Sequence, residues 1–255
     1  LLQFPITLTD AISYCVPVAS FSPSKRRDAA MSILIVLNGN TSCDYEKLRK
    51  YGTLSYIHCS QIHNADFEDL LEGKTAMLIT GGPQHVYDLA AFPELYHELF
   101  LLDMAIKRRL RVIGICLGFQ LINYYFGNRV ERLPGPVVGD GFLDVDSVCC
   151  VGDHRLLELN PDVLTKACSF HYDGVYENRH PDLHVVARSI PVTGAPQGLV
   201  YFVRHRFLPI YGIQSHPDAS AQSLQACLKK YGRAATVHDD SYYNAIWDEF
   251  FTLLK

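Results

Sequence analysis

The motif that restricts the fold most is GICLG, in which Cys116 stands between Gly114 and Gly118. The apolar run Arg111–Ile115 is typical of a buried strand, and Leu117–Phe126 has the apolar spacing of a helix. A sharp strand-to-helix turn of this kind raises its central side chain above the sheet, and glycines are needed where the backbone crowds its neighbours. The positive end of the helix dipole would then favour a thiolate. A buried cysteine at an ordinary strand end is the alternative.

The first half of the chain alternates strand and helix patterns. Short β-branched runs predict strands at Ile33–Leu37, Ser55–Cys59 and Thr75–Thr80, and helical spacing is present at Asp44–Tyr51 and Phe92–Arg109. Strands that alternate with helices in this way form parallel sheets. We therefore expect an α/β fold, with a mostly parallel central sheet flanked by helices on both faces in the flavodoxin-like arrangement.

The second half of the chain has a different pattern. In Val130–Val203 glycine and proline are frequent, helical spacing is scarce and the expected strands are short, which predicts an additional small antiparallel sheet region. One more strand is expected at Tyr211–Gln214, and a closing amphipathic helix at Tyr242–Leu254. Residues 1–31 show no clean period, so we expect an N-terminal extension there and one domain over residues 32–255.

Composition and charge narrow the class of protein. The 255 residues are 48% hydrophobic and 20% charged, which is ordinary for a globular protein, and the net charge of −4 disfavours a nucleic-acid or anionic-membrane surface. No apolar run approaches the roughly 18 residues that span a bilayer. The eight cysteines include no C-x-x-C pair, which disfavours a disulfide scaffold and a zinc site. We therefore expect a cytoplasmic protein with no metal, no other cofactor, and neither nucleic acid nor membrane as a partner.

A second motif, GIQSHPD, supplies the groups that a nucleophilic thiol needs. His216 follows an expected strand about 100 residues after Cys116, and Asp218 stands two residues later, beyond a proline. An imidazole can act as the base, and a carboxylate can orient it. His-Pro-Asp is a common tripeptide, so by itself it does not indicate a catalytic site. It does so only together with GICLG. The two motifs predict a catalytic triad of Cys116, His216 and Asp218.

The third motif, TGGP, ends the expected strand Thr75–Thr80. A glycine at a strand end can present its backbone amide close to a ligand, because no side chain blocks the approach. The amide of one of these glycines and that of Leu117, directly after the cysteine, are therefore the expected donors of an oxyanion hole.

In their order and spacing these motifs resemble the class I glutamine amidotransferase domain of the triad type. The matching segments are TGGPQHVYD at 80–88, GICLGFQ at 114–120 and GIQSHPD at 212–218. The segment FHYDGV at 170–175 resembles a fourth family motif, S-H-x-D-x-V. The resemblance extends over about residues 32–255.

The resemblance implies roles for particular residues. Cys116 would attack the side-chain amide of glutamine to form a γ-glutamyl thioester and release ammonia, and His216 would relay the proton and then activate water. Asp218 would orient His216 in place of the glutamate usual in the family, and we expect activity to survive this shorter side chain. Gly82 and Leu117 would offer their backbone amides to the oxyanion. The residues implied to hold the substrate are Gln120, His171, Tyr172 and Asp173.

Three functions are compatible with these motifs. The favoured one is a glutaminase that supplies ammonia to a synthetase partner, because the chain shows no ATP-binding loop and has no room for a synthetase domain. The second is a free-standing hydrolase of γ-glutamyl peptides or conjugates, which uses the same thioester. The third is a non-catalytic regulatory relative, which predicts a broken triad, whereas all three positions are filled here.

Overall fold

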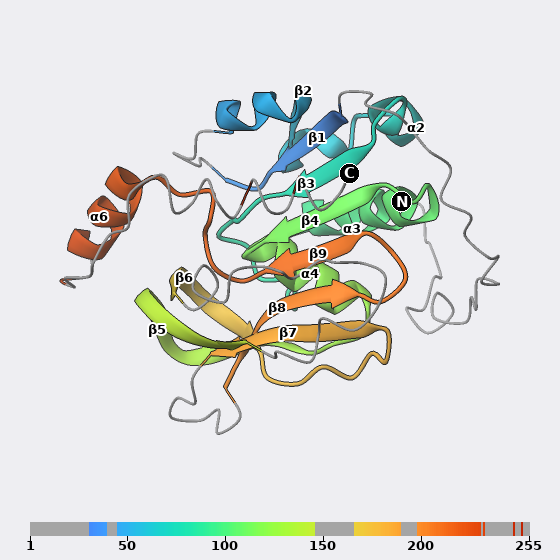
Figure 1. The fold of residues 1–255 in the computed structure, drawn as a ribbon. Helices are drawn as coiled ribbons and strands as arrows, with labels where there is room; N and C mark the ends of the chain where they lie inside the picture. The colour runs from blue at the N-terminus through green and yellow to red at the C-terminus, as the bar shows by residue number, and fades with distance from the viewer. Residues whose placement is uncertain are drawn as a thin grey trace.

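The computed structural model describes the central part of the chain (Figure 1). The predicted extension over residues 1–31 and the predicted helix Tyr242–Leu254 lie outside the described residues, except for Met31, Trp247 and Phe251. The described residues are 31–39, 45–145, 166–189, 198–230, 232, 247 and 251.

Five strands form the parallel half of one sheet. In chain order they are β1 (Met31–Leu37), β2 (Gly52–His58), β3 (Ala76–Ile79), β4 (Arg111–Ile115) and β9 (Ile210–Ile213). They lie in the order β2-β1-β3-β4-β9, and every neighbouring pair is parallel. Apart from the edge strand β2 they are almost entirely buried and rich in branched apolar residues, as expected for strands covered on both faces. The predicted mostly parallel α/β sheet is confirmed.

Four further strands continue the same sheet in antiparallel fashion. They are β5 (Val130–Val145), β6 (Lys166–Val175), β7 (Leu183–Ser189) and β8 (Val200–His205). β8 pairs with β9, so both halves form one nine-stranded sheet, and β7 pairs with both β5 and β8. The predicted antiparallel region is confirmed, although it extends the parallel sheet instead of forming a separate one.

The expectation of short strands in this region was wrong. β5 has 16 residues and β6 has 10, and they pair along most of their length. The register shifts between Arg132 and Val137, on either side of the LPGP segment. A bulge at this point accommodates the prolines, which cannot donate to the ladder, so the strand continues beyond them.

Four helices share a hydrophobic core on one face of the sheet. They are α1 (Cys59–Ile62), α2 (Phe67–Leu71), α3 (Glu94–Lys107) and α4 (Leu117–Tyr125), and α3 and α4 pack against β4 (Figure 1). α3 and α4 match the predicted helices to within two residues at each end. The Asp66 carboxylate begins α2 by accepting hydrogen bonds from two backbone amides.

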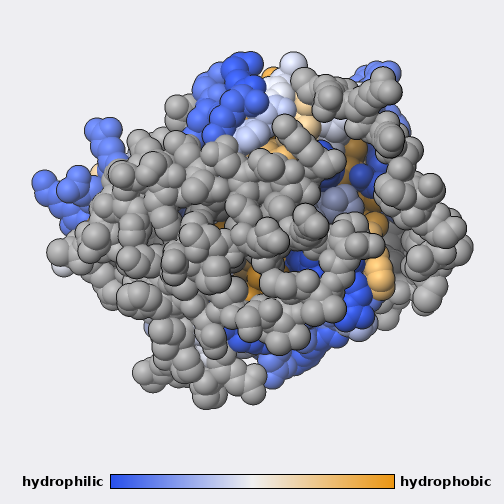
Figure 2. Space-filling view, viewed as in Figure 1, coloured by the Kyte–Doolittle hydropathy of each residue, from blue (hydrophilic) through white to orange (hydrophobic). Residues whose placement is uncertain are grey.

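The opposite face of the sheet has its own core. Leu48 of the 3-10 helix η2 (Glu46–Lys50) packs there together with Trp247 and Phe251, and the ring of Phe251 stacks on Tyr51 at 4.4 Å. The sequence predicts a longer α-helix for this segment. The charged side chains of η2 face outward, and Figure 2 shows hydrophilic side chains gathered at the top of the view, over this part of the molecule.

The sequence patterns do not predict α6 (Ala221–Lys230). Its apolar face is short, with Leu224, Cys227 and Leu228 at helical spacing among polar residues, and it was not recognised from the sequence. Ser220 precedes the helix, and its Oγ accepts a hydrogen bond from the Ser223 amide at 3.1 Å, which is a typical N-terminal cap. Within the described part of the chain, every helix is too short or too polar to cross a membrane.

Candidate active site

Cys116 lies between β4 and α4 in strained backbone. Its φ is +51° and its ψ is −99°, a conformation that L-residues rarely adopt. A Cβ atom on Gly114 would lie 2.4 Å from the carbonyl of Gly118, and one on Gly118 would lie 2.3 Å from the Ile79 oxygen. Both positions therefore require glycine, and the turn has the geometry that the GICLG motif predicts.

The sheet brings Cys116 and His216 together. β4 and β9 are parallel neighbours, and the Cys116 amide donates to the Ile213 oxygen at 2.9 Å. A Cβ atom on Gly81 would lie 2.8 Å from Cε1 of His216 and 3.3 Å from Cβ of Cys116. The imidazole and the thiol-bearing carbon thus border the same glycine.

Asp218 lies behind the imidazole. Nδ1 of His216 is 3.1 Å from Oδ1 of Asp218, which leaves Nε2 for the Cys116 side chain. Burial by itself lowers the pKa of His216, but the charge of Cys116 and the hydrogen bond to Asp218 outweigh it and raise the pKa well above its ordinary value. A protonated imidazole next to a thiol favours a thiolate–imidazolium pair.

The two predicted oxyanion donors come from the loop after β3 and from the start of α4. A Cβ atom on Gly82 would lie 2.4 Å from Oε1 of Gln84 and 2.5 Å from the Asn38 oxygen, so only glycine fits there. Leu117 is the first residue of α4, directly after Cys116. Within the described residues neither amide donates a backbone hydrogen bond, so both are available as donors.

Two of the residues implied to hold the substrate are engaged by protein groups. Nε2 of Gln120 donates to the backbone carbonyl oxygen of Asp173 at 3.3 Å and to Oε1 of Gln214 at 3.2 Å. Nδ1 of His171 lies 2.8 Å from the backbone carbonyl oxygen of Asp173, and Nε2 lies 2.9 Å from Oη of Tyr201. Burial lowers the pKa of His171 to about 4, so this imidazole is uncharged at neutral pH.

The carboxylate of Asp173 lies at the centre of a polar cluster. It accepts hydrogen bonds from His85 at 2.6 Å and Tyr87 at 3.1 Å, and Arg132 pairs with it at 3.5 Å. The Arg132 guanidinium also lies 4.6 Å from the ring centroid of Tyr172, the fourth residue implied to hold the substrate. The cluster joins the motifs at 80–88 and 170–175 with Arg132, which belongs to neither, and no single motif predicts that these three segments meet.

Contacts from two further aromatic residues reach the triad, and sequence reasoning missed both. Oη of Tyr45 donates to Oδ2 of Asp218 at 2.6 Å. Nε1 of Trp247 donates to the carbonyl oxygen of Pro217 at 3.1 Å. Neither residue belongs to a motif, and a lone aromatic residue far away in the sequence carries no local signal of such a role.

A buried carboxyl group supports the loop that carries Gly81 and Gly82. Nδ2 of Asn38 donates to the Thr80 oxygen at 3.3 Å and to Oε2 of Glu98 at 2.9 Å. Glu98 is 1% exposed, and within the described residues no cation pairs with it. Burial raises its pKa from 4.5 to about 8, against the opposing effect of the Asn38 hydrogen bond, so Glu98 is mostly protonated at neutral pH.

We expect Glu98→Gln to make stability less dependent on pH. Between its ordinary pKa of 4.5 and about 8, the folded chain keeps a proton on Glu98 that the unfolded chain has lost. The stabilisation from the neutral carboxyl group therefore falls as pH rises through that range. Glutamine keeps the shape without the titration, so the variant should be the more stable protein at about pH 8.5 and should lose less stability from about pH 6. Urea unfolding at both pH values, with the exposed Glu72→Gln as control, measures these differences. An equal change of the unfolding free energy with pH in the variant and the wild type would contradict the prediction.

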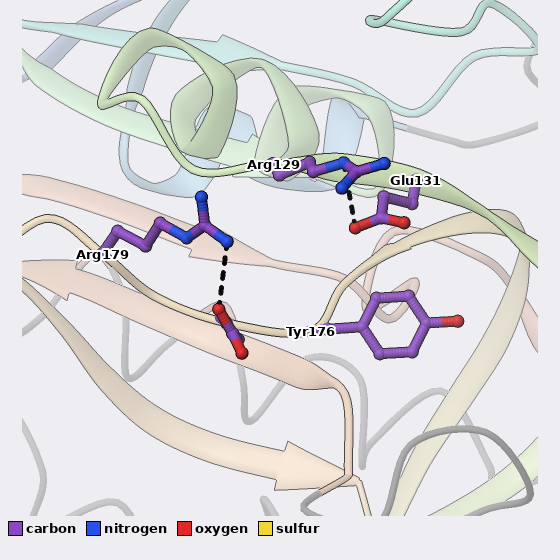
Figure 3. A pocket seen from close by; sticks show the side chains of 5 residues that line it. Arg129, Glu131, Tyr176 and Arg179 are labelled. Atoms are coloured by element: carbon purple, nitrogen blue, oxygen red, sulfur yellow. Dashed lines mark hydrogen bonds and ion pairs between the residues drawn. The ribbon is translucent and has the colours of Figure 1, made fainter.

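A cavity of about 220 Å³ lies beside the start of β5 and the end of β6 (Figure 3). Its two cations are already paired, Arg129 with Glu131 at 3.1 Å and Arg179 with Glu177 at 3.2 Å. These side chains are largely exposed, and none of the predicted site residues lines the cavity. The cavity therefore adds nothing to the candidate site.

Curated proteins similar to this chain include GMP synthases and a component of an anthranilate synthase. The GMP synthase [glutamine-hydrolyzing] of Anaplasma marginale is 29% identical over 145 residues, which are 57% of this chain and 26% of that protein. The anthranilate synthase component 2 of Azospirillum brasilense is 32% identical over 121 residues, 47% of this chain and 55% of its own length. The chain thus spans about a quarter to about half of the length of these relatives.

Solved structures with the same fold include two from Thermotoga maritima. A glutamine amidotransferase superimposes with a TM-score of 0.64 at 19% identity, covering 89% of this chain and 96% of that one. A chain of PurLQS superimposes with a TM-score of 0.60 at 16% identity, covering 89% of this chain and 100% of that one. The family model described as "Glutamine amidotransferase class-I" matches residues 42–230, which is most of the chain. The chain therefore belongs to the class I glutamine amidotransferase family.

Proposed function

We propose that this chain is a glutaminase that hydrolyses the side-chain amide of glutamine and supplies ammonia to an acceptor on a synthetase partner. The observation that carries the proposal is the convergence of Cys116 and His216 on Gly81, with Asp218 behind the imidazole. The family supports it, since its members are amidotransferases and the GMP synthases that resemble this chain are named as glutamine-hydrolysing.

The first half of the reaction forms a thioester. The Cys116 thiolate attacks the side-chain carbonyl carbon of glutamine, and the electron pair of the C=O bond moves to oxygen. The amides of Gly82 and Leu117 donate hydrogen bonds to that oxyanion. His216 then gives its Nε2 proton to the leaving nitrogen, the C–N bond breaks, and ammonia departs from a γ-glutamyl thioester.

The second half of the reaction regenerates the thiolate. Neutral His216 takes a proton from water, and the resulting hydroxide attacks the thioester carbonyl. The same two amides stabilise the second oxyanion. When it collapses, the C–S bond breaks, glutamate leaves and the thiolate–imidazolium pair is restored. Asp218 remains ionised throughout and holds Nδ1 of the imidazole.

A partner is part of the proposal because the ammonia needs an acceptor. The aligned residues make up only 26% of the Anaplasma GMP synthase. We propose that the acceptor is bound by a synthetase partner, either a separate subunit or a further segment of a longer chain.

A second candidate is a hydrolase of γ-glutamyl peptides or conjugates. The observation that favours it is an open groove of about 450 Å³ whose lining includes Tyr87 and Arg132. Both side chains contact the carboxylate of Asp173, one of the residues that the family resemblance implies to hold the substrate. A groove there provides room for a substrate longer than glutamine.

The experiment offers the purified chain glutamine and a panel of γ-glutamyl peptides, and measures the ammonia and the amine released. A diazo-ketone analogue of glutamine is used in parallel, and mass spectrometry identifies the labelled residue. We expect ammonia from glutamine and labelling at Cys116. Peptide cleavage without ammonia from glutamine would establish the second candidate, and the absence of both turnover and labelling would establish a non-catalytic relative.

A further inference from the structure

The carboxylate of Asp218 is held from two sides. Oδ1 faces Nδ1 of His216 at 3.1 Å, and Oδ2 accepts the hydroxyl proton of Tyr45 at 2.6 Å. The second distance is at the short end of the range for O–H···O bonds, as expected when the acceptor is ionised. Tyr45 is 4% exposed and Asp218 is 1% exposed, so water has little access to this bond.

The backbone between the two triad residues is also fixed from outside. Nε1 of the fully buried Trp247 donates to the carbonyl oxygen of Pro217, the residue between His216 and Asp218. Tyr45 lies directly before η2 and belongs to the same core cluster as Trp247. Both contacts therefore come from one side of the sheet, the face opposite to α1–α4.

Such support matters because the orienting residue is an aspartate. Its carboxylate is one methylene closer to the backbone than the glutamate usual at this position, so its place depends directly on the backbone of the His-Pro-Asp turn. A positioning error of about 1 Å in a reacting group can cost about 10²-fold in rate. A donor on Oδ2 fixes the rotation of the carboxylate, and with it the direction of the imidazole.

We propose that Tyr45 is a positioning residue for the triad, whose hydroxyl group fixes the Asp218 carboxylate so that His216 faces Cys116. This inference rests on the proposed thiol chemistry of Cys116. The hydrogen bond described for the Tyr45 hydroxyl group is to Asp218, and we therefore place its effect on the triad at that carboxylate. Removal of its hydroxyl group leaves a buried carboxylate oxygen without this donor and leaves the rest of the ring in the core.

The test compares Tyr45→Phe with the wild type and with Tyr56→Phe. Tyr56 is the matched control, because its hydroxyl group bonds the exposed carboxylate of Glu46 at 2.8 Å, outside the site. The first measurement is the rate of Cys116 alkylation by iodoacetamide against pH, which reports the thiolate without any assumption about the substrate. The second is kcat and KM for the substrate found in the assay above.

We expect Tyr45→Phe to slow the alkylation of Cys116 at neutral pH by about 10-fold, because a misdirected imidazolium stabilises the thiolate less. We expect kcat to fall about 10-fold while KM changes less than about twofold, since the hydrogen bond described for the Tyr45 hydroxyl group is to Asp218, which is not among the residues implied to hold the substrate. Tyr56→Phe should match the wild type in both measurements. Thermal unfolding of the Tyr45→Phe protein verifies that it is folded at the assay temperature.

The outcomes separate this inference from the proposed function. A wild-type chain whose Cys116 reacts no faster than a free thiol would refute the proposed function itself. A wild-type chain with a reactive thiolate, together with a Tyr45→Phe variant that has the same alkylation profile and the same kcat, would overturn the role of Tyr45 and leave the glutaminase intact. An equal fall of kcat in Tyr56→Phe would overturn it as well, because the effect would not be specific to the Asp218 contact.

Discussion

Replacement of Cys116 with alanine should lower turnover by at least about 10³-fold, because among the site residues that the structure describes only Cys116 carries the thiol that forms the thioester. The fold should survive the change. The positive φ of this position strains alanine as much as cysteine, so the backbone energy is similar in both proteins. The glutaminase assay and thermal unfolding, applied to the same preparation, measure the two effects.

Cys59 supplies the matched control for this variant. It is the other free cysteine among those whose side chains the structure describes, and burial, followed by the charges of Glu98 and Glu94, raises its pKa to about 11. A thiol of this kind is inert at neutral pH. Cys59→Ala should therefore keep its turnover, and the diazo-ketone label should remain on Cys116. Full turnover in Cys116→Ala would show that the nucleophile lies elsewhere.

Replacement of Asp218 with asparagine should lower turnover by about 10²- to 10⁴-fold. The Tyr45 hydroxyl donates to one oxygen of Asp218, so the asparagine carbonyl would turn toward Tyr45 and its NH₂ group toward Nδ1 of His216. Nδ1 would then have to accept a proton instead of donating one. The neutral imidazole would carry its proton on Nε2, facing Cys116, and could not deprotonate the thiol or water.

The same substitution should shift the pH profile. The hydrogen bond to Asp218 and the charge of Cys116 together raise the pKa of His216, so the imidazolium persists to higher pH than usual. Without the carboxylate this pKa falls, and the basic limb of kcat/KM against pH should move to lower pH. Asp218→Glu, which restores the residue usual in the family, should retain more activity than Asp218→Asn, and the exposed Asp69→Asn should behave as the wild type. An unshifted basic limb in Asp218→Asn would show that Asp218 does not act on His216.

The sequence by itself determined the local geometry around Cys116. Two glycines four residues apart, after an apolar strand and before a helix, leave room for only one kind of turn. The structure shows why: a Cβ atom on either glycine would overlap backbone atoms. The alternation of strands and helices likewise determined the parallel sheet, because it depends on side-chain periods that a single sequence displays. The motifs also indicated that His216 and Asp218 belong with Cys116.

Tertiary structure alone decided which groups surround that triad. The pairing of β4 with β9 places Cys116 beside His216, and no local pattern encodes the order of strands in a sheet. The engagement of both His171 nitrogens with Asp173 and Tyr201 depends on contacts between strands, and so does the long β5–β6 ladder that a bulge permits. Tyr45 reaches Asp218 across 173 residues. Such contacts are set by packing between distant segments. They contribute to the free energy of folding only after the chain between those segments has formed a closed loop.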